Sequence, residues 1–215
     1  MVKTKLKYLG HASFQIKVND KVIYIDPYAG EYIEKADLIL ITHSHRDHCD
    51  TSKIKSIQKE DTLIYGPKPC STLISNIEVI QEGSKINFNN IIIKAVPAYN
   101  IKRFRAPGIP FHPKGFGVGY LITINDKTLY HAGDTDYIPE MKTLRNIYLA
   151  MLPIGGTYTM DIEEAVEATK TIKPRIVIPM HMRNKNPLEF AEKIGEKTKS
   201  VVVILKPNEE YNLIT

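Results

Sequence analysis

Three imidazoles and one carboxylate fall within six residues of the sequence, directly after a short apolar run. The segment reads Ile41-Thr42-His43-Ser44-His45-Arg46-Asp47-His48. His43 and His45 lie two residues apart, so in extended chain they point the same way. A turn after them would bring Asp47 and His48 to the other side of the same small volume. Imidazole and carboxylate are ligands that suit zinc, iron and manganese, so this segment predicts a metal site.

Two later segments each offer one more metal ligand at the end of an apolar run. Asp134 lies in the turn Gly133-Asp134-Thr135, where its carboxylate could bridge two ions. His181 follows the predicted strand Ile176–Ile178. Because the carboxyl ends of strands carry the ligand sites of α/β proteins, we expect Asp134 and His181 to join the same site.

The remaining polar signals are histidines beside glycines and one long basic loop. His11 and His131 are expected to support the ligands through hydrogen bonds, with substrate contact or proton transfer as the alternative. The stretch from 97 to 117 has 21 residues and contains four basic residues and no acidic one. Loops of this length commonly bind ligands or close over them. We therefore expect Arg103, Arg105 and Lys114 to bind an anionic substrate.

The elements that must position these residues are short apolar runs bounded by Gly, Pro, Asn or Asp. The predicted strands are Lys5–Leu9, Phe14–Val18, Val22–Ile25, Leu38–Ile41, Leu63–Tyr65, Ile91–Val96, Val118–Ile124, Thr128–Tyr130, Tyr148–Leu152, Ile176–Ile178 and Val201–Leu205. The predicted helices are Thr51–Gln58, Asp161–Ile172, 186 to about 198 and, more weakly, Tyr137–Leu144. Strands first and helices late favour a layered α/β sandwich.

A faint internal repeat suggests how the chain is organised. The segment from Asp20 to Pro27 resembles that from Asp126 to Gly133, and each leads into another apolar strand. Two similar halves could pack their sheets face to face around a cleft, although short hairpins can also be alike by chance. No polar linker divides the chain, so we expect a single domain over residues 1–215.

Composition limits the class of protein. The 215 residues include 29 Lys+Arg and 24 Asp+Glu, which gives a net charge of +5, and 43% are hydrophobic. This is the composition of a globular protein. No apolar stretch is long enough for a membrane span, and no secretory signal is recognisable, so a cytoplasmic protein is expected. The charge would suit a small anionic substrate or, less well, nucleic acid. Nothing indicates the oligomeric state.

Taken together, these motifs resemble those of the metallo-β-lactamase fold superfamily. The order Asp26, His43–His48, Gly133-Asp134-Thr135 and His181 follows that family over nearly the whole chain. Segments such as Gly10-His11-Ala12-Ser13 are most similar to small metal-dependent hydrolases related to ascorbate-6-phosphate lactonases. The resemblance implies an αββα four-layer sandwich with two face-to-face mixed sheets and a cleft that holds two metal ions.

The resemblance also assigns roles. His43 and His45 would hold one ion. Asp47, His48 and His181 would hold the other, Asp134 would bridge the two, and Asp26 would orient the histidine loop. The family usually supplies a further histidine where this chain has Asn100. An amide oxygen is a poorer zinc ligand, so His112 in the same loop is a candidate replacement, and both residues are possible metal or substrate contacts.

The chemistry that follows is hydrolysis. Two divalent cations, zinc or else manganese or iron, would lower the pKa of a bridging water and supply hydroxide near neutral pH. Its target would be an ester, lactone or phosphodiester of a small anion, and Asp47 could accept the proton. A nuclease acting on RNA or DNA is one alternative, although the chain leaves no room for a polymer-gripping module. A non-catalytic metal-binding protein is the other, if Asn100 has disabled one site.

Overall fold

The structure, a computed structural model, describes residues 4–213. The chain forms two compact units. The first contains the residues up to Gln81 and from Leu205 onward, and the second spans Glu82–Ile204.

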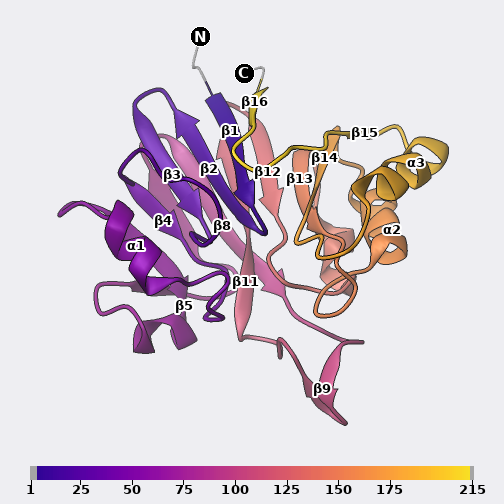
Figure 1. Cartoon of the computed structure of the whole chain (residues 1–215), viewed down its shortest axis with the longest axis horizontal. Helices are drawn as coiled ribbons and strands as arrows, with labels where there is room; N and C mark the ends of the chain where they lie inside the picture. Colours follow the sequence, from indigo (N-terminus) through magenta and orange to yellow (C-terminus); the bar gives the residue numbers. More distant parts are fainter. Residues whose placement is uncertain (1–3, 214–215) are drawn as a thin grey trace. The chain divides into compact units, whose positions relative to one another are not determined.

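The first unit is built on a mixed sheet of seven strands (Figure 1). In chain order the strands are β1 (Thr4–Gly10), β2 (Ser13–Val18), β3 (Lys21–Ile25), β4 (Leu38–Leu40), β5 (Leu63–Pro67), β6 (Glu78–Ile80) and β16 (Glu210–Leu213). They lie in the order β16-β1-β2-β3-β4-β5-β6. Neighbours from β16 to β3 are antiparallel, whereas β3 to β6 run parallel. The carboxyl ends of β3, β4 and β5 therefore lie at one edge of the sheet.

One face of this sheet is covered by helix α1 (Thr51–Ile57), and the 3₁₀ helix η1 (Lys68–Thr72) follows β5. Asp50 caps α1, because its carboxylate accepts a hydrogen bond from the backbone N–H of Lys53 at 3.0 Å. The helix buries Ile54 and Ile57 in a core cluster that also contains Cys49 and Cys70. The loop that carries the histidine motif is thus held between β4 and a packed helix.

The second unit is built on another seven-stranded mixed sheet. Its strands are β7 (Lys85–Phe88), β8 (Ile91–Ala98), β11 (Gly117–Ile124), β12 (Lys127–His131), β13 (Ile147–Pro153), β14 (Ile176–Met180) and β15 (Val201–Val202). The order is β15-β14-β13-β12-β11-β8-β7. Strands β7, β8, β11 and β12 are antiparallel neighbours, and β12 to β15 run parallel.

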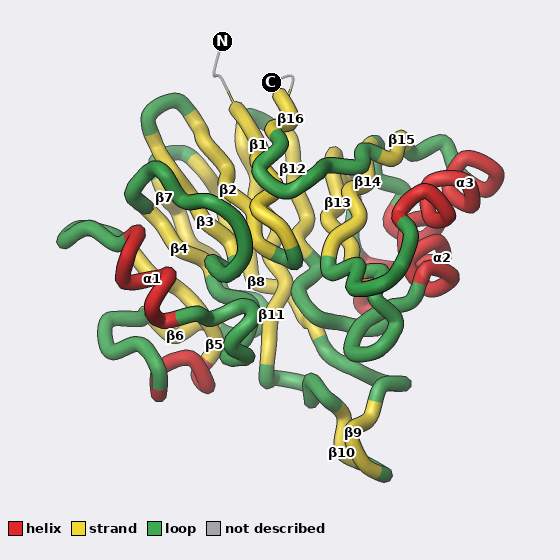
Figure 2. Tube along the Cα trace, viewed as in Figure 1, coloured by secondary structure: helices red, strands yellow, loops and turns green. Residues whose placement is uncertain are grey.

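Helices α2 (Ile162–Ile172) and α3 (Pro187–Lys197) pack against each other in this unit, and the 3₁₀ helix η2 (Pro139–Thr143) contacts α2. Asp161 and Glu164 form a capping box at the start of α2, with each side chain bonded to the other residue's backbone N–H. A two-stranded hairpin of β9 (Phe104–Ala106) and β10 (Ile109–Pro110) extends beyond the sheet (Figure 2).

The two sheets have the same topology, which agrees with the internal repeat in the sequence. In each, three antiparallel strands (β1-β2-β3 and β8-β11-β12) are followed by parallel strands. The repeated segments occupy equivalent places, because one contains β3 and the other contains β12. The predicted α/β class, with two mixed sheets and flanking helices, is confirmed. That residues 1–215 act as a single domain stays a prediction.

Several predicted elements differ from the structure. The stretch from 97 to 117 is not structureless, because the Pro107-Gly108 turn closes the β9–β10 hairpin, with Gly108 at a φ of 72°. The predicted helix Tyr137–Leu144 is the short 3₁₀ helix η2. The strand expected over Val201–Leu205 ends at Val202. Strands β6, β7 and β16, each three or four residues long, were not predicted.

No helix within residues 4–213 is long and apolar enough to cross a membrane.

Candidate metal centre

In the first unit, the histidine motif begins directly after β4, beside the end of β3. Asp26 is the residue after β3, and its side chain is fully buried. His43 and His48 are also buried, each with at most 1% of its surface exposed. Because β3 and β4 are parallel neighbours, their ends deliver Asp26 and the motif to the same edge of the sheet. Fully buried aspartate is uncommon and requires hydrogen-bond partners.

Asp26 finds these partners in the motif itself. Its Oδ1 accepts the backbone N–H of Thr42 at 2.7 Å, and its Oδ2 accepts the Thr42 hydroxyl at 2.7 Å. Oδ2 also lies 2.7 Å from Nδ1 of His48. The Thr42 hydroxyl is 3.0 Å from Nδ1 of His43, so it can accept from that ring while it donates to Asp26. One carboxylate therefore orients both imidazoles.

This arrangement determines which ring nitrogens of these histidines carry lone pairs. An acceptor at Nδ1 places the ring proton there, so the neutral ring keeps its lone pair on Nε2. A carboxylate behind a ligating histidine is the usual support of a metal site, because it fixes the tautomer and raises the basicity of the ring. His43 and His48 thus have the tautomer that a metal ligand needs.

The other motif residues complete a cluster of metal-type donors. Nε2 of His43 lies 3.1 Å from Nδ1 of His45, which requires a proton or a cation between the two nitrogens. The ring centroids of His43 and His48 are 4.1 Å apart. Asp47 Oδ2 lies 3.0 Å from Nε2 of His11, at the turn between β1 and β2. His11 therefore holds one oxygen of the Asp47 carboxylate, and its expected supporting role at the site stays a prediction.

The second unit gathers its own donors at the ends of β12 and β14. Asp134 Oδ2 lies 3.3 Å from Nε2 of His181 and 3.5 Å from Nε2 of His112. All three side chains are at least 95% buried. Two imidazole nitrogens directed at one carboxylate oxygen form a donor set of the kind that holds a divalent cation.

Asn100 and His112, which the sequence left ambiguous, have different roles in this cluster. The amide oxygen of Asn100 accepts the backbone N–H of His112 at 2.9 Å and lies 2.8 Å from its Nδ1. The oxygen is thus used by His112. His112 instead directs Nε2 toward Asp134, 3.5 Å from its Oδ2, so His112 stays the candidate ligand of the two.

Backbone conformation also marks candidate site residues in each unit. His11, Asp26 and His181 have φ values of 55°, 48° and 47°, in the left-handed region that costs energy for residues other than glycine. At Gly155, an added Cβ would lie 2.5 Å from the carbonyl oxygen of His181, so only glycine allows this approach. His131, also buried, accepts the N–H of Gly133 at Nδ1, 3.2 Å away, beside the turn that carries Asp134.

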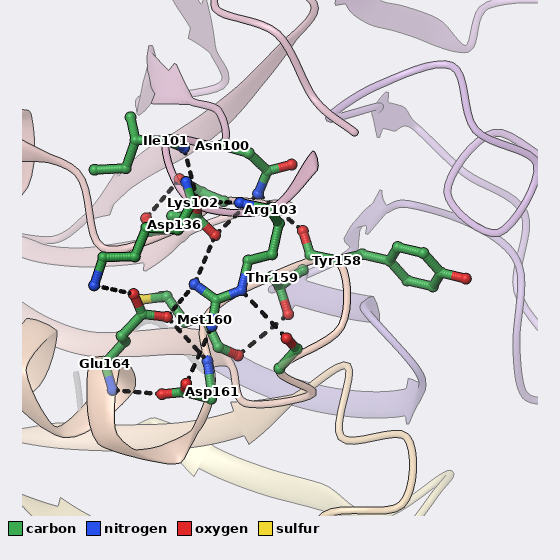
Figure 3. Close-up of polar contacts among 12 residues, drawn as sticks. Asn100, Ile101, Lys102, Arg103, Asp136, Tyr158, Thr159, Met160, Asp161 and Glu164 are labelled. Atoms are coloured by element: carbon green, nitrogen blue, oxygen red, sulfur yellow. Dashed lines mark hydrogen bonds and ion pairs between the residues drawn. The ribbon is translucent and has the colours of Figure 1, made fainter. Parts of the chain in front are cut away.

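The three basic residues predicted to bind substrate differ in their surroundings. Arg103 is only 11% exposed, and its guanidinium pairs with Asp136, Asp161 and Glu164 (Figure 3). Those carboxylates pair with both Nη groups of Arg103, which gives it a structural role in this unit, and its predicted substrate-binding role stays a prediction.

Lys114 is exposed, pairs with Glu140 at 2.8 Å, and lies over the ring of Tyr99. The Glu140 hydrogen bond raises the pKa of Lys114 above its ordinary value. Arg105 is exposed on the β9–β10 hairpin and remains available to an anion.

Two features of the structure escaped sequence analysis, one in each unit. Asp136 was not singled out, although it lies two residues after Asp134 and is fully buried. The signal that could have found it is the second aspartate of Asp134-Thr135-Asp136. The second feature lies in the first unit, where Cys49 and Cys70 share the core cluster. The Cys70 thiol donates to Cys49, and this hydrogen bond, with burial, raises the pKa of Cys70 well above its usual range.

Replacing Asp26 by asparagine tests the orienting role. The amide would present an NH₂ group to at least one donor, so the His48 ring loses its fixed orientation. We expect metal affinity to fall about 10- to 100-fold, as is typical when the partner of a ligating histidine is removed. Competition with a chelator measures this. Asp37→Asn is the control, because Asp37 pairs with Lys59 at 2.7 Å and contacts no histidine of the motif. Equal affinities in the two variants would contradict the role.

Comparison with known proteins identifies the family. Residues 5–181 match the model of the beta-lactamase superfamily domain. The chain belongs to this superfamily, and its two mixed sheets with flanking helices are those of the metallo-β-lactamase fold.

Relatives that align along nearly their whole length narrow the group. A UPF0173 metal-dependent hydrolase of Pyrococcus horikoshii is 34% identical, with 97% of this chain and 99% of the relative aligned. A UPF0173 metal-dependent hydrolase of Nanoarchaeum equitans is also 34% identical, over 95% of this chain and 98% of the relative. The structure of Igni18, a metallo hydrolase from Ignicoccus hospitalis, aligns with a TM-score of 0.81 and 27% identity over 99% of both chains. The protein is a metal-dependent hydrolase of this group.

Proposed function

We propose that the protein hydrolyses an ester, lactone or phosphodiester of a small anionic substrate, with two divalent cations as cofactors. Zinc is the expected ion, and manganese or iron would suit the same donors. The proposed ligands are the histidine and aspartate donors of both units, namely His43, His45, Asp47, His48, Asp134 and His181, with His112 added. Asp26, His11 and His131 support them.

The observation that carries this proposal is the set of hydrogen bonds that fix the Nδ1 atoms of the candidate ligand histidines. Asp26 fixes Nδ1 of His48 directly and Nδ1 of His43 through Thr42. A polar loop without a metal has no need for two buried imidazoles that both keep the lone pair on Nε2. The same logic holds in the second unit, where Asn100 fixes Nδ1 of His112. The donors present therefore fit a divalent cation.

When bound, such cations polarise the scissile group and lower the pKa of water. The chain supplies the proton acceptor. Solvent reaches Asp47, since its side chain is 41% exposed, and His11 holds one of its oxygens. We propose that Asp47 accepts the proton of the attacking water, which requires a carboxylate fixed within hydrogen-bond reach of the substrate.

Basic side chains close in sequence to His181 support an anionic substrate. Arg183 and Lys185 follow His181 closely, and both are exposed. The Arg183 guanidinium lies over the ring of Tyr158, 4.9 Å from its centroid, which holds the side chain in place while its donors stay available. Arg105, on the hairpin, would add a further charge. Guanidinium groups bind carboxylate and phosphate with two parallel hydrogen bonds.

Reversing the charge of Arg105 tests the anionic class. Arg105→Glu should raise KM for an anionic substrate and leave kcat nearly unchanged, because a uniform binding contact is lost. The control is Lys199→Glu, which makes the same charge change on an exposed lysine next to β15. An unchanged KM in Arg105→Glu would remove the hairpin from substrate binding.

The proposed function is tested by a substrate screen on protein with defined metal content. Metal-depleted protein is reloaded with zinc, manganese or iron(II) and assayed against aryl esters, sugar lactones, phosphorylated lactones and bis(p-nitrophenyl) phosphate. We expect turnover of at least one class that depends on the added metal. Cleavage of single-stranded RNA or DNA alone would favour the nuclease alternative. Tight metal binding without turnover of any substrate would favour a binding protein.

A further inference from the structure

The amide of Asn100 uses all of its hydrogen-bonding positions inside the second unit. Its Nδ2 donates to Asp136 Oδ1 at 3.0 Å and to the carbonyl oxygen of Tyr158 at 2.9 Å. Its Oδ1 receives the backbone N–H of His112 at 2.9 Å and lies 2.8 Å from Nδ1 of that residue. An amide with two acceptors on its nitrogen side cannot rotate by half a turn without placing its oxygen against them. The oxygen is therefore locked toward His112.

Asp136 in turn is held by the chain segment that precedes His112. Its Oδ2 accepts the backbone N–H groups of Ile101 at 2.7 Å and Lys102 at 2.6 Å, while its Oδ1 accepts from Arg103 Nη1 at 3.0 Å (Figure 3). The carboxylate is fully buried. A buried carboxylate needs such charge compensation, so Asp136 draws this segment and the Arg103 side chain around itself.

Arg103 ties the same group to the start of α2. Its Nη2 lies 3.2 Å from Asp161 Oδ2, its Nη1 pairs with Glu164, and its Nε donates to the Gly156 carbonyl at 3.2 Å. Asp161 and Glu164 are also the capping box of α2. The base of the hairpin is thus fastened to a helix end rather than left as a mobile loop.

From these contacts we propose that Asn100 is a positioning residue that fixes His112 as an Nε2 donor toward Asp134, with Asp136 and Arg103 holding Asn100. The proposal rests on the proposed function, since it treats His112 as a metal ligand. Asn100 accepts from Nδ1 of His112 as Asp26 accepts from Nδ1 of His48, but the acceptor is a neutral amide and not a carboxylate. Because Asp134 and Asp136 belong to one turn, that turn carries both a ligand and the anchor of the segment leading to His112.

The ring tautomer of His112 is the direct test. Long-range proton–nitrogen NMR spectra of the metal-free protein, above the pH range in which imidazoles titrate, report which nitrogen carries the proton. His112→Gln assigns the signal. We expect the proton on Nδ1 in the wild-type protein, as also for His48. A proton on Nε2 of His112 would overturn the proposal, and this measurement needs no variant of Asn100 to fold.

Variants of Asn100 separate positioning from general structural support. Asn100→Ala should abolish the Nδ1 preference of His112 and lower zinc affinity about 10- to 100-fold by chelator competition, while the His48 tautomer stays unchanged. Asn100→Asp keeps an acceptor for Nδ1 and should restore the tautomer, although it loses both donors. An Nδ1 proton that persists in a folded Asn100→Ala protein would contradict the proposal.

The outcomes also distinguish this proposal from the proposed function. If the protein binds no divalent cation but His112 shows the Nδ1 proton and loses it in Asn100→Ala, the positioning stands and the metal function fails. If the wild-type protein binds zinc and hydrolyses substrate with affinity unchanged in Asn100→Ala, the function stands and the positioning fails. Arg103→Met gives an independent check, since it should lower zinc affinity in the same direction by loosening Asp136.

Discussion

Replacing His48 by alanine should reduce kcat/KM by more than about 100-fold, because removing a ligand exceeds the loss caused by removing a residue that only orients one. His181→Ala should have a similar effect. The physical reason is the same in both, namely the loss of an imidazole donor and, with it, of the cation that we propose it holds. Hydrolysis rates and bound metal, measured on the same preparations by elemental analysis, test the expectation.

The double variant His48→Ala with His181→Ala adds a sharper test. If both residues serve one catalytic centre, the two losses should be far from additive, since a centre already disabled by one substitution has little left to lose. Two losses whose free energies simply add would contradict a shared centre. The control is Asp61→Asn, which changes a side chain that is 81% exposed and should affect neither metal content nor rate.

Asp47→Asn is expected to have the second large effect. An amide cannot accept the proton of the attacking water, and general-base catalysis typically contributes about 10²- to 10⁴-fold. If Asp47 acts as proton acceptor, kcat should fall within this range while KM changes little. Steady-state kinetics on the best substrate of the screen measures both.

His11 provides the matched comparison for Asp47. His11→Ala leaves the carboxylate in place but removes the partner 3.0 Å from its Oδ2. We expect a smaller fall in kcat than in Asp47→Asn. If His11→Ala reduced kcat as much as Asp47→Asn while metal content stayed constant, His11 rather than Asp47 would be the proton acceptor.

The sequence predicted those parts of the protein that depend on local patterns. Apolar runs with turn residues at their ends gave strands such as β2 and β11 nearly to their limits. The helices predicted over Thr51–Gln58 and Asp161–Ile172 are α1 and α2, which begin at Asp50 and at the Asp161/Glu164 capping box, and capping is a local interaction. The repeat of Asp20–Pro27 and Asp126–Gly133 predicted equivalent strands, since a hairpin is specified by its own residues.

The basic loop shows where local pattern fails. Within residues 97–117 no acidic residue accompanies Arg103, so its charge suggested an exposed substrate contact. Its partners Asp136, Asp161 and Glu164 come from later segments, and no spacing rule connects them to the loop. Whether a charged side chain such as Arg103 is exposed or buried therefore depends on partners that only the folded unit brings to it.

Asn100 and His112 show the same limit at the candidate site. The departure from the family pattern at Asn100 was visible in the sequence, and His112 could be named as a candidate. Twelve residues separate the pair in the chain, and the β9–β10 hairpin between them brings the amide to the ring. Because hairpin geometry and not sequence distance sets this contact, only the folded unit could show that the amide serves the imidazole.

Stepwise addition of zinc to metal-depleted protein, with hydrolysis followed at each step, is the decisive test of metal-dependent hydrolysis. We expect depleted protein to be inactive, and activity to rise with bound zinc and to saturate at two ions per chain. We also expect His48→Ala and His181→Ala to fail to recover activity at the same zinc concentration. Full hydrolytic activity in protein that elemental analysis shows to contain no metal would contradict metal-dependent hydrolysis.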